Sequence, residues 1–295
     1  MRYDAHEVLV APARSSAGLK RLVGGVLLLV PLFLALSFGY AALLPVLFGP
    51  ENWAQAQDGV GQASTPAGVL INLLTFGLLI VALGVVVRIV HRRDLGTLIG
   101  PIPLAMRQFG RAFLAMVLLY GVVALIPMPE SVAPTQNVAF GTWAKFLLPA
   151  LVALFLQVFA EELIFRGYLQ SQLAARFASP VIWLAVPSVA FALLHFDAMN
   201  YGGNVWVVVL WAGAFGVVAG DLTARFGTLG PATALHFINN VSAILIAAPE
   251  GMFDGLALYS YPFAINDARA ITAMMSMDLL VLLCGWLAIR LSLRG

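Results

Sequence analysis

The feature that most constrains this chain is a series of long apolar stretches that recurs from one end to the other. A helix that crosses ~30 Å of hydrocarbon needs about 20 mainly apolar residues, and eight stretches fit or approach that length. They are residues 22–47, 67–90, 109–127, 143–165, 180–196, 204–224, 229–248 and 271–291. The pattern predicts an all-α integral membrane protein, a bundle of about eight transmembrane helices.

The composition is unfavourable for a water-soluble globule. Hydrophobic residues make up 61% of the 295 residues and charged residues 10%, which leaves too little polar surface to face water. No hydrophilic block is long enough to fold alone, so we expect one multi-span membrane domain over residues 1–295, with a cytoplasmic segment at residues 1–21. The formal charge of +2 gives no reason to expect a nucleic-acid partner.

The positions of the basic residues predict the orientation of the chain in the cell membrane. With eight spans and a cytoplasmic N-terminus, 14 of the 16 Lys and Arg residues lie at cytoplasmic helix ends, as the positive-inside rule favours. The 14 are Arg2, Arg14, Lys20, Arg21, Arg88, Arg92, Arg93, Arg107, Arg111, Arg166, Arg176, Arg225, Arg290 and Arg294. Only Lys145 and Arg269 fall outside, so both termini are expected in the cytoplasm.

Two adjacent carboxylates follow the apolar run 146–160. Ionisable groups at that depth usually face a cavity or a partner, so Glu161 and Glu162 indicate an intramembrane polar cavity. Arg166 lies four residues after Glu162, the favourable order for a helical ion pair, and these two are expected to support the site. Glu161 is turned by about 100° on the helix, towards the side of Gln157, and remains free to act as a general base.

Two of the four histidines lie in apolar stretches, where an imidazole needs a partner. His195 closes the fifth stretch and His236 lies within the seventh; taken singly, each could equally be a hydrogen-bonded core residue. Asn240 is one helical turn beyond His236, so imidazole and carboxamide could donate hydrogen bonds to one substrate oxygen, as in an oxyanion hole. Asn239 is rotated further around the helix and is the weaker candidate.

At these residues the sequence resembles the CPBP intramembrane glutamic endopeptidase family, also called the ABI or type II CAAX prenyl endopeptidase family. The Glu-Glu-x-x-x-Arg motif of that family stands here at residues 161–166, its Phe-x-x-x-His motif at 191–195 and its His-x-x-x-Asn motif at 236–240. The three motifs occur in this order on separate expected helices. The segment 143–248 would then form the core that carries the catalytic motifs.

The resemblance implies an intramembrane peptidase that hydrolyses a peptide bond with a glutamate-activated water and without a cofactor. Glu161 and His195 would activate the water. His236 and Asn240 would stabilise the tetrahedral intermediate, with the ion pair of Glu162 as support. The partners would be the lipid bilayer and a peptide or membrane-protein substrate, either a prenylated CAAX C-terminus or another peptide, as in bacteriocin self-immunity.

The same residues allow other functions. One carboxylate and two imidazoles form a known catalytic zinc set, so Glu161, His195 and His236 could be the metal ligands of a zinc-dependent protease, although no His-Glu-x-x-His spacing is present. Glu161 and Glu162 could instead relay protons or bind a cation in a transporter, although the sequence contains no inverted repeat. A scaffold without activity would keep the fold alone, and the intact motifs argue against it.

The expected depth of the site residues poses a geometric problem. At ~1.5 Å per residue, Glu161 lies about 7 Å from Arg166, whereas His195 lies about 22 Å from Pro180. Straight helices would leave the two side chains at different depths. Either the stretch 167–179 dips into the membrane, or the fifth helix starts deeper, or the catalytic assignment fails.

Overall fold

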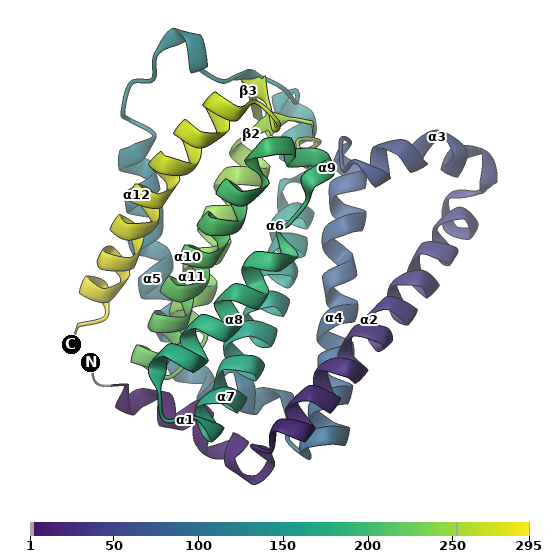
Figure 1. Ribbon diagram of the computed structural model, residues 1–295. Helices are drawn as coiled ribbons and strands as arrows, with labels where there is room; N and C mark the ends of the chain where they lie inside the picture. Colours follow the sequence, from purple (N-terminus) through teal and green to yellow (C-terminus); the bar gives the residue numbers. More distant parts are fainter. Residues whose placement is uncertain (1–2, 252, 295) are drawn as a thin grey trace.

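The computed structural model describes residues 3–251 and 253–294, which form a helical bundle. The first and last described residues lie at the same end of the bundle (Figure 1). The α-helices are α1 Glu7–Val10, α2 Leu19–Phe48, α3 Pro50–Gly61, α4 Pro66–His91, α5 Ile102–Val123, α6 Phe140–Glu162, α7 Ser171–Arg176, α8 Pro180–Leu194, α9 Ala198–Tyr201, α10 Val205–Phe226, α11 Gly230–Asn240 and α12 Ala268–Ser292. Two π-helices, Leu163–Gln170 and Val241–Ile246, follow α6 and α11. The strands are β1 Thr135–Gln136, β2 Ala247–Glu250 and β3 Tyr259–Ala264.

Six helical runs in the described part of the chain are long and apolar enough to cross a membrane. They are Leu19–Phe48, Pro66–His91, Ile102–Val123, Phe140–Arg176, Ala198–Phe226 and Ala268–Ser292. Large apolar side chains are exposed on the outside of the bundle, for example Val46 at 76% and Leu148 at 72%, which fits a surface that faces lipid. The protein is therefore a multi-pass helical membrane protein, as predicted.

Two of the eight predicted spans correspond to shorter helices. The fifth stretch forms α8, which has 15 residues, and the seventh forms α11, which has 11 residues and continues into a π-helix of 6. Helix α8 packs against α10, and α11 packs against α5 and α10. Neither helix alone has the ~20 residues of an independent span, and the number eight stays a prediction.

The fourth predicted span was wrong in its length. We expected it to end at residue 165, but helical backbone continues from α6 through the first π-helix and α7 to Arg176. Helix α8 then returns from Pro180. Glu161 precedes Arg176 by 15 residues, and His195 follows Pro180 by 15 residues, so at ~1.5 Å per residue both side chains lie about 22 Å from this end of the bundle. The depth problem is thereby removed.

The opposite end of the bundle carries α3 and a small sheet (Figure 1). Strand β3 lies in the middle, antiparallel to β1 and parallel to β2. Beside the sheet, the indole Nε1 of Trp143 donates a hydrogen bond to the carbonyl of Leu245 at 2.8 Å. This bond ties the start of α6 to the end of the π-helix that follows α11, and so links the two segments that carry the Glu-Glu and His-x-x-x-Asn motifs.

The N-terminal segment lies across the end of the bundle where both termini are found, and α1 is part of it (Figure 1). The hydroxyl of Tyr3 donates to one oxygen of Asp221 at 2.8 Å, and the indole of Trp286 donates to the other at 2.8 Å. Gly227 allows the segment to approach, because a Cβ there would lie 2.4 Å from the carbonyl oxygen of Ala5. Residues 1 and 2 of the predicted cytoplasmic segment 1–21 lie outside the described residues.

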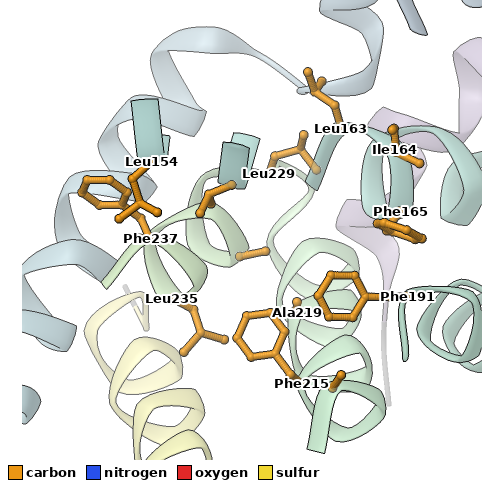
Figure 2. Close-up of a cluster of buried hydrophobic side chains, with 14 of the residues drawn as sticks. Leu154, Leu163, Ile164, Phe165, Phe191, Phe215, Ala219, Leu229, Leu235 and Phe237 are labelled. Carbon is orange, nitrogen blue, oxygen red and sulfur yellow. The ribbon is translucent and has the colours of Figure 1, made fainter. Parts of the chain in front are cut away.

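Buried aromatic and aliphatic side chains form a core between the helices (Figure 2). The ring centroids of Phe165 and Phe191 are 5.1 Å apart, and those of Phe191 and Phe215 are 5.9 Å apart. Helix α8 approaches α10 closely at Gly216, where a Cβ would lie 2.8 Å from the Cβ of Ser188. Such close packing fixes the helices and gives the polar side chains between them a dry setting.

Candidate active site

The polar groups of the site come from three helices whose geometry changes where the motifs lie. Glu161 and Glu162 are the last two residues of α6, and Asn240 is the last residue of α11. A π-helix begins directly after each of these ends. Such π segments occur frequently at functional sites. His195 is the cap residue at the C-terminal end of α8.

Glu162 is the centre of a fully buried charged group. Its side chain is 0% exposed, and its Oε1 lies 2.9 Å from Nη1 of Arg166, which is 1% exposed. The same oxygen lies 2.8 Å from Nδ1 of His236. A buried carboxylate is stable only with such partners, so the predicted ion pair is present and His236 is its third member. The guanidinium of Arg166 also lies 4.8 Å from the ring centroid of Phe191, a favourable cation–π distance.

The two adjacent glutamates differ in exposure and in partners. The side chain of Glu161 is 15% exposed, whereas that of Glu162 is 0% exposed. Oε2 of Glu161 lies 3.5 Å from Nε2 of His236, which is beyond a good hydrogen bond, and it has no hydrogen-bond partner among the described residues. His236 therefore lies between the two carboxylates. Its Nδ1 is bound to Glu162, and its Nε2 faces Glu161.

A chain of hydrogen bonds orients the amide of Asn240. The hydroxyl of Tyr120 on α5 donates to Oδ1 of Asn239 at 3.1 Å. Nδ2 of Asn239 donates to Oδ1 of Asn240 at 3.3 Å, and Nδ2 of Asn240 donates to Oε1 of Gln157 at 3.0 Å. Because Gln157 precedes Glu161 by one turn of α6, the amide of Asn240 points towards the side of α6 that carries Glu161.

Tyr120 was missed by the sequence reasoning. It lies in the apolar stretch 109–127, and the hydroxyl of a tyrosine in such a stretch usually needs a hydrogen-bond partner. That signal indicates a polar contact for Tyr120, but it does not say which helix supplies the partner.

His195 forms its hydrogen bond within its own helix rather than with the glutamates. Its Nδ1 is 2.9 Å from the carbonyl oxygen of Phe191, and because a carbonyl only accepts, Nδ1 carries the hydrogen and Nε2 of the neutral ring is an acceptor. The ring centroids of His195 and Phe191 are 4.5 Å apart, and Phe191 in turn lies 6.0 Å from the ring of His236. No hydrogen bond or ion pair between His195 and Glu161 is found among the described residues.

The described residues contain no group of three or more His, Cys, Asp or Glu side chains placed to hold a metal ion. In the zinc alternative the ligands would be Glu161, His195 and His236. Nδ1 of His236 is engaged by Glu162, and the ring of Phe191 lies against the rings of both His195 and His236.

The fold and these groups define a class of protein: a multi-pass helical membrane protein with a buried centre of carboxylates and imidazole. Residues 143–242 match the family model of type II CAAX prenyl endopeptidase, Rce1-like. The match begins in α6 and ends two residues after Asn240, so it contains all three motifs. The resemblance predicted from the motifs is confirmed, and the match indicates a membrane protease of the CAAX type.

A curated relative is an uncharacterized protein of Bacillus subtilis (strain 168), YyaK. The two sequences are 26% identical over 230 residues, which are 75% of this chain and 75% of the relative. No solved structure gave a significant match.

Proposed function

We propose that the protein is an intramembrane endopeptidase in which Glu161 activates the water that hydrolyses the peptide bond. The observation that carries this proposal is the different setting of the two adjacent carboxylates. Oε2 of both side chains lacks a hydrogen-bond partner among the described residues, but Oε1 of the fully buried Glu162 binds Arg166 and His236. Glu161 is 15% exposed, and its nearest described polar partner is Nε2 of His236 at 3.5 Å. A poorly hydrated carboxylate of this kind is suited to take a proton from water.

The residues would then act in two steps, the attack of the water and the release of the amine. Glu161 takes one proton from the water while the oxygen of the water bonds to the carbonyl carbon of the substrate. The carbonyl oxygen then becomes negatively charged. The amide of Asn240 donates one of its two hydrogens to Oε1 of Gln157. Its second hydrogen would be donated in a hydrogen bond to the negatively charged oxygen. A His236 ring with hydrogens on both nitrogens would donate to Glu162 through Nδ1 and to the oxyanion through Nε2. Glu161 finally gives its proton to the leaving amine as the C–N bond breaks.

His195 would orient the attacking water through Nε2, the ring atom left as an acceptor. The motif resemblance supports this role, and so does the equal number of residues that separates His195 and Glu161 from the same end of the bundle.

We further propose that the substrate reaches the site from the cytoplasm, where both termini lie. The described ends of the chain share one end of the bundle (Figure 1), and 14 of the 16 basic residues fall at cytoplasmic ends in the predicted topology. The description of the matched family makes a prenylated C-terminal peptide the first substrate to test. A peptide without a prenyl group is the second.

The test is cleavage of a library of prenylated and unprenylated peptides by purified protein in proteoliposomes. Glu161→Gln keeps the shape of the side chain but removes the base, so hydrolysis should fall to background. The variant should stay folded in detergent, because a neutral amide costs less to bury than a carboxylate. Glu51→Gln is the matched control, since Glu51 is an exposed carboxylate on α3. Full activity of Glu161→Gln would rule out the mechanism.

The same assay separates a glutamate-activated water from zinc. In the metal-free mechanism, the purified protein contains less than stoichiometric zinc, and activity survives a chelator that inactivates a control zinc protease. Activity that disappears on chelation and returns with added zinc would make Glu161, His195 and His236 ligands, and the glutamate-base mechanism would have to be abandoned.

A further inference from the structure

A hollow at the end of the bundle that carries both termini lies apart from the candidate active site. Its volume is about 590 Å³, and its walls are residues 14–18, the first turn of α2 and the end of α7. The lining includes four basic side chains, Arg14, Lys20, Arg21 and Arg176, and no carboxylate. Such a concentration of positive charge attracts anions to the hollow.

Most of this positive charge has no partner within the described residues. Arg14 is an exception, because it forms a double hydrogen bond with the carboxylate of Glu7. Arg21 donates only to the backbone carbonyl of Ser15, at 3.3 Å. For Lys20 and Arg176 no hydrogen bond or ion pair is found in residues 3–251 and 253–294. Three cationic groups therefore face the hollow without a counter-charge.

The walls of the hollow are fixed by a buried polar cluster behind them. Ser16 is 2% exposed, and its hydroxyl lies 3.0 Å from Nδ1 of His91 and 3.3 Å from Nε2 of Gln172. The other nitrogen of His91 lies 2.8 Å from the hydroxyl of Tyr168. The loop that leads into α2 is thus held by α4, the first π-helix and α7, and the basic side chains project from an anchored backbone.

The backbone at the start of α2 adds to the attraction for an anion. The N-cap residue is Gly18, which has no side chain to accept from the first turn. Free N–H groups and the positive end of the helix dipole favour negative charge at this position. Helix α2 is also the first predicted span, so Lys20 and Arg21 lie where the chain enters the membrane, which is the level of lipid headgroups.

We propose that this hollow binds the phosphate group of an anionic phospholipid. Lys20, Arg21 and Arg176 surround the phosphate, and the first turn of α2 contacts it through backbone N–H groups. The bound lipid joins the start of α2 to α7, which continues the helix of Glu161 and Glu162. The proposal does not depend on the catalytic mechanism, because it rests on charge and geometry at the far end of that helix.

The experiment compares two double variants by native mass spectrometry of detergent-purified protein with phosphatidylglycerol. Lys20→Gln with Arg176→Gln removes two charges at the hollow, and Lys145→Gln with Arg269→Gln removes two exposed charges on α6 and α12 that do not line it. We expect the first variant to bind phosphatidylglycerol roughly tenfold more weakly or worse than the wild type. The second should bind as the wild type does. Equal melting temperatures without lipid show that both variants are folded.

Two further binding measurements, with phosphatidylcholine and with inorganic phosphate, identify the ligand. Phosphatidylcholine, which carries the same phosphate but no net charge, should be retained weakly and alike by all three proteins. Millimolar inorganic phosphate should fail to displace phosphatidylglycerol from the wild type, because it lacks the acyl chains that lie in the bilayer. Displacement by inorganic phosphate would assign the hollow to the free ion, and equal losses in the two double variants would reduce the effect to general surface charge; either result overturns the proposal.

Discussion

Asn240 and Asn239 are neighbours in sequence but direct their amides differently. Asn240 donates towards α6 and the side of Glu161, whereas Asn239 is engaged by Tyr120 on α5. If the amide of Asn240 donates to the oxyanion, Asn240→Ala should lower turnover by roughly a hundredfold or more. Asn239→Ala should lower it much less, because it disturbs only the orientation of its neighbour. Steady-state cleavage in proteoliposomes measures both, and equal or reversed losses would contradict the assignment.

Glu162 and Glu161 should differ in their effects on stability. Removing one member of a buried ion pair leaves the other charge uncompensated and costs about 3–5 kcal/mol. Glu162→Gln should therefore lower the free energy of unfolding by about 3 kcal/mol or more, because Arg166 is 1% exposed.

Glu161→Gln is the control for this comparison. Its side chain forms no ion pair with Arg166 and is partly exposed, so the substitution should change the unfolding midpoint little. Unfolding in mixed micelles compares the two variants. A larger loss for Glu161→Gln than for Glu162→Gln would mean that the supporting and the free carboxylate have been exchanged.

The contact between Glu162 and Arg166 could be predicted, whereas the place of His236 could not. A spacing of four residues brings two side chains together on any helix, so the ion pair follows from local geometry. His236 lies 74 positions from Glu162, and their contact depends on how α11 packs against α6. The bond from Tyr120 to Asn239 likewise depends on packing, between α5 and α11.

Among the helices, the fourth span shows why a hydropathy pattern can end a helix too early. The charged residues Glu161, Glu162 and Arg166 interrupt the apolar run, so we expected the span to stop at residue 165. In the structure Glu162 and Arg166 compensate each other inside the protein, and the helical backbone continues to Arg176. A hydropathy pattern scores each residue separately, so it does not predict that buried charges neutralise each other. It does not predict either π-helix.

The N-terminal segment should make stability depend on pH through His6. Its ring is 3% exposed and lies 4.8 Å from the ring of Trp183. Burial lowers the pKa of His6 from 6.5 to about 4, and the nearby charge of Glu7 opposes this shift only in part. Between these two pKa values the unfolded chain binds a proton that the folded chain does not, so stability falls as the pH is lowered through this window and is fully present above it.

From these pKa values, the wild type should be about 2 kcal/mol less stable at pH 5 than at pH 7 through His6 alone. Other groups titrate in the same range, so the measurement is the difference from His6→Gln, whose side chain does not titrate. Unfolding in detergent at the two pH values should show a smaller loss for the variant. An identical pH dependence in both proteins would mean that His6 is hydrated in the folded state.

For the whole molecule, the number and direction of the crossings stay predictions, which rest on charge as much as on hydropathy. Helices α8 and α11, with 15 and 11 residues, are shorter than the apolar stretches 180–196 and 229–248 that predicted them as spans. The even number of predicted spans agrees with the position of both described chain ends at one end of the bundle (Figure 1). The three-stranded sheet at the other end was not predicted, because its longest strand has 6 residues and its pairings join distant segments.

The topology itself can be tested with reporters. A reporter fused after Arg294 should be cytoplasmic, because the basic residues concentrate at the end of the bundle that carries the termini. Reporters inserted near Asp58 in α3 or near Asp254 should be external, because α3 and the small sheet lie at the opposite end (Figure 1). A cytoplasmic signal at Asp254 would contradict the eight-span topology. An odd number of spans would place the chain ends on opposite sides. The bias of basic residues, which is 13 against 2 once Arg166 is counted inside the span that runs to Arg176, would then lose its physical reason, since positive charge is retained preferentially on the cytoplasmic side.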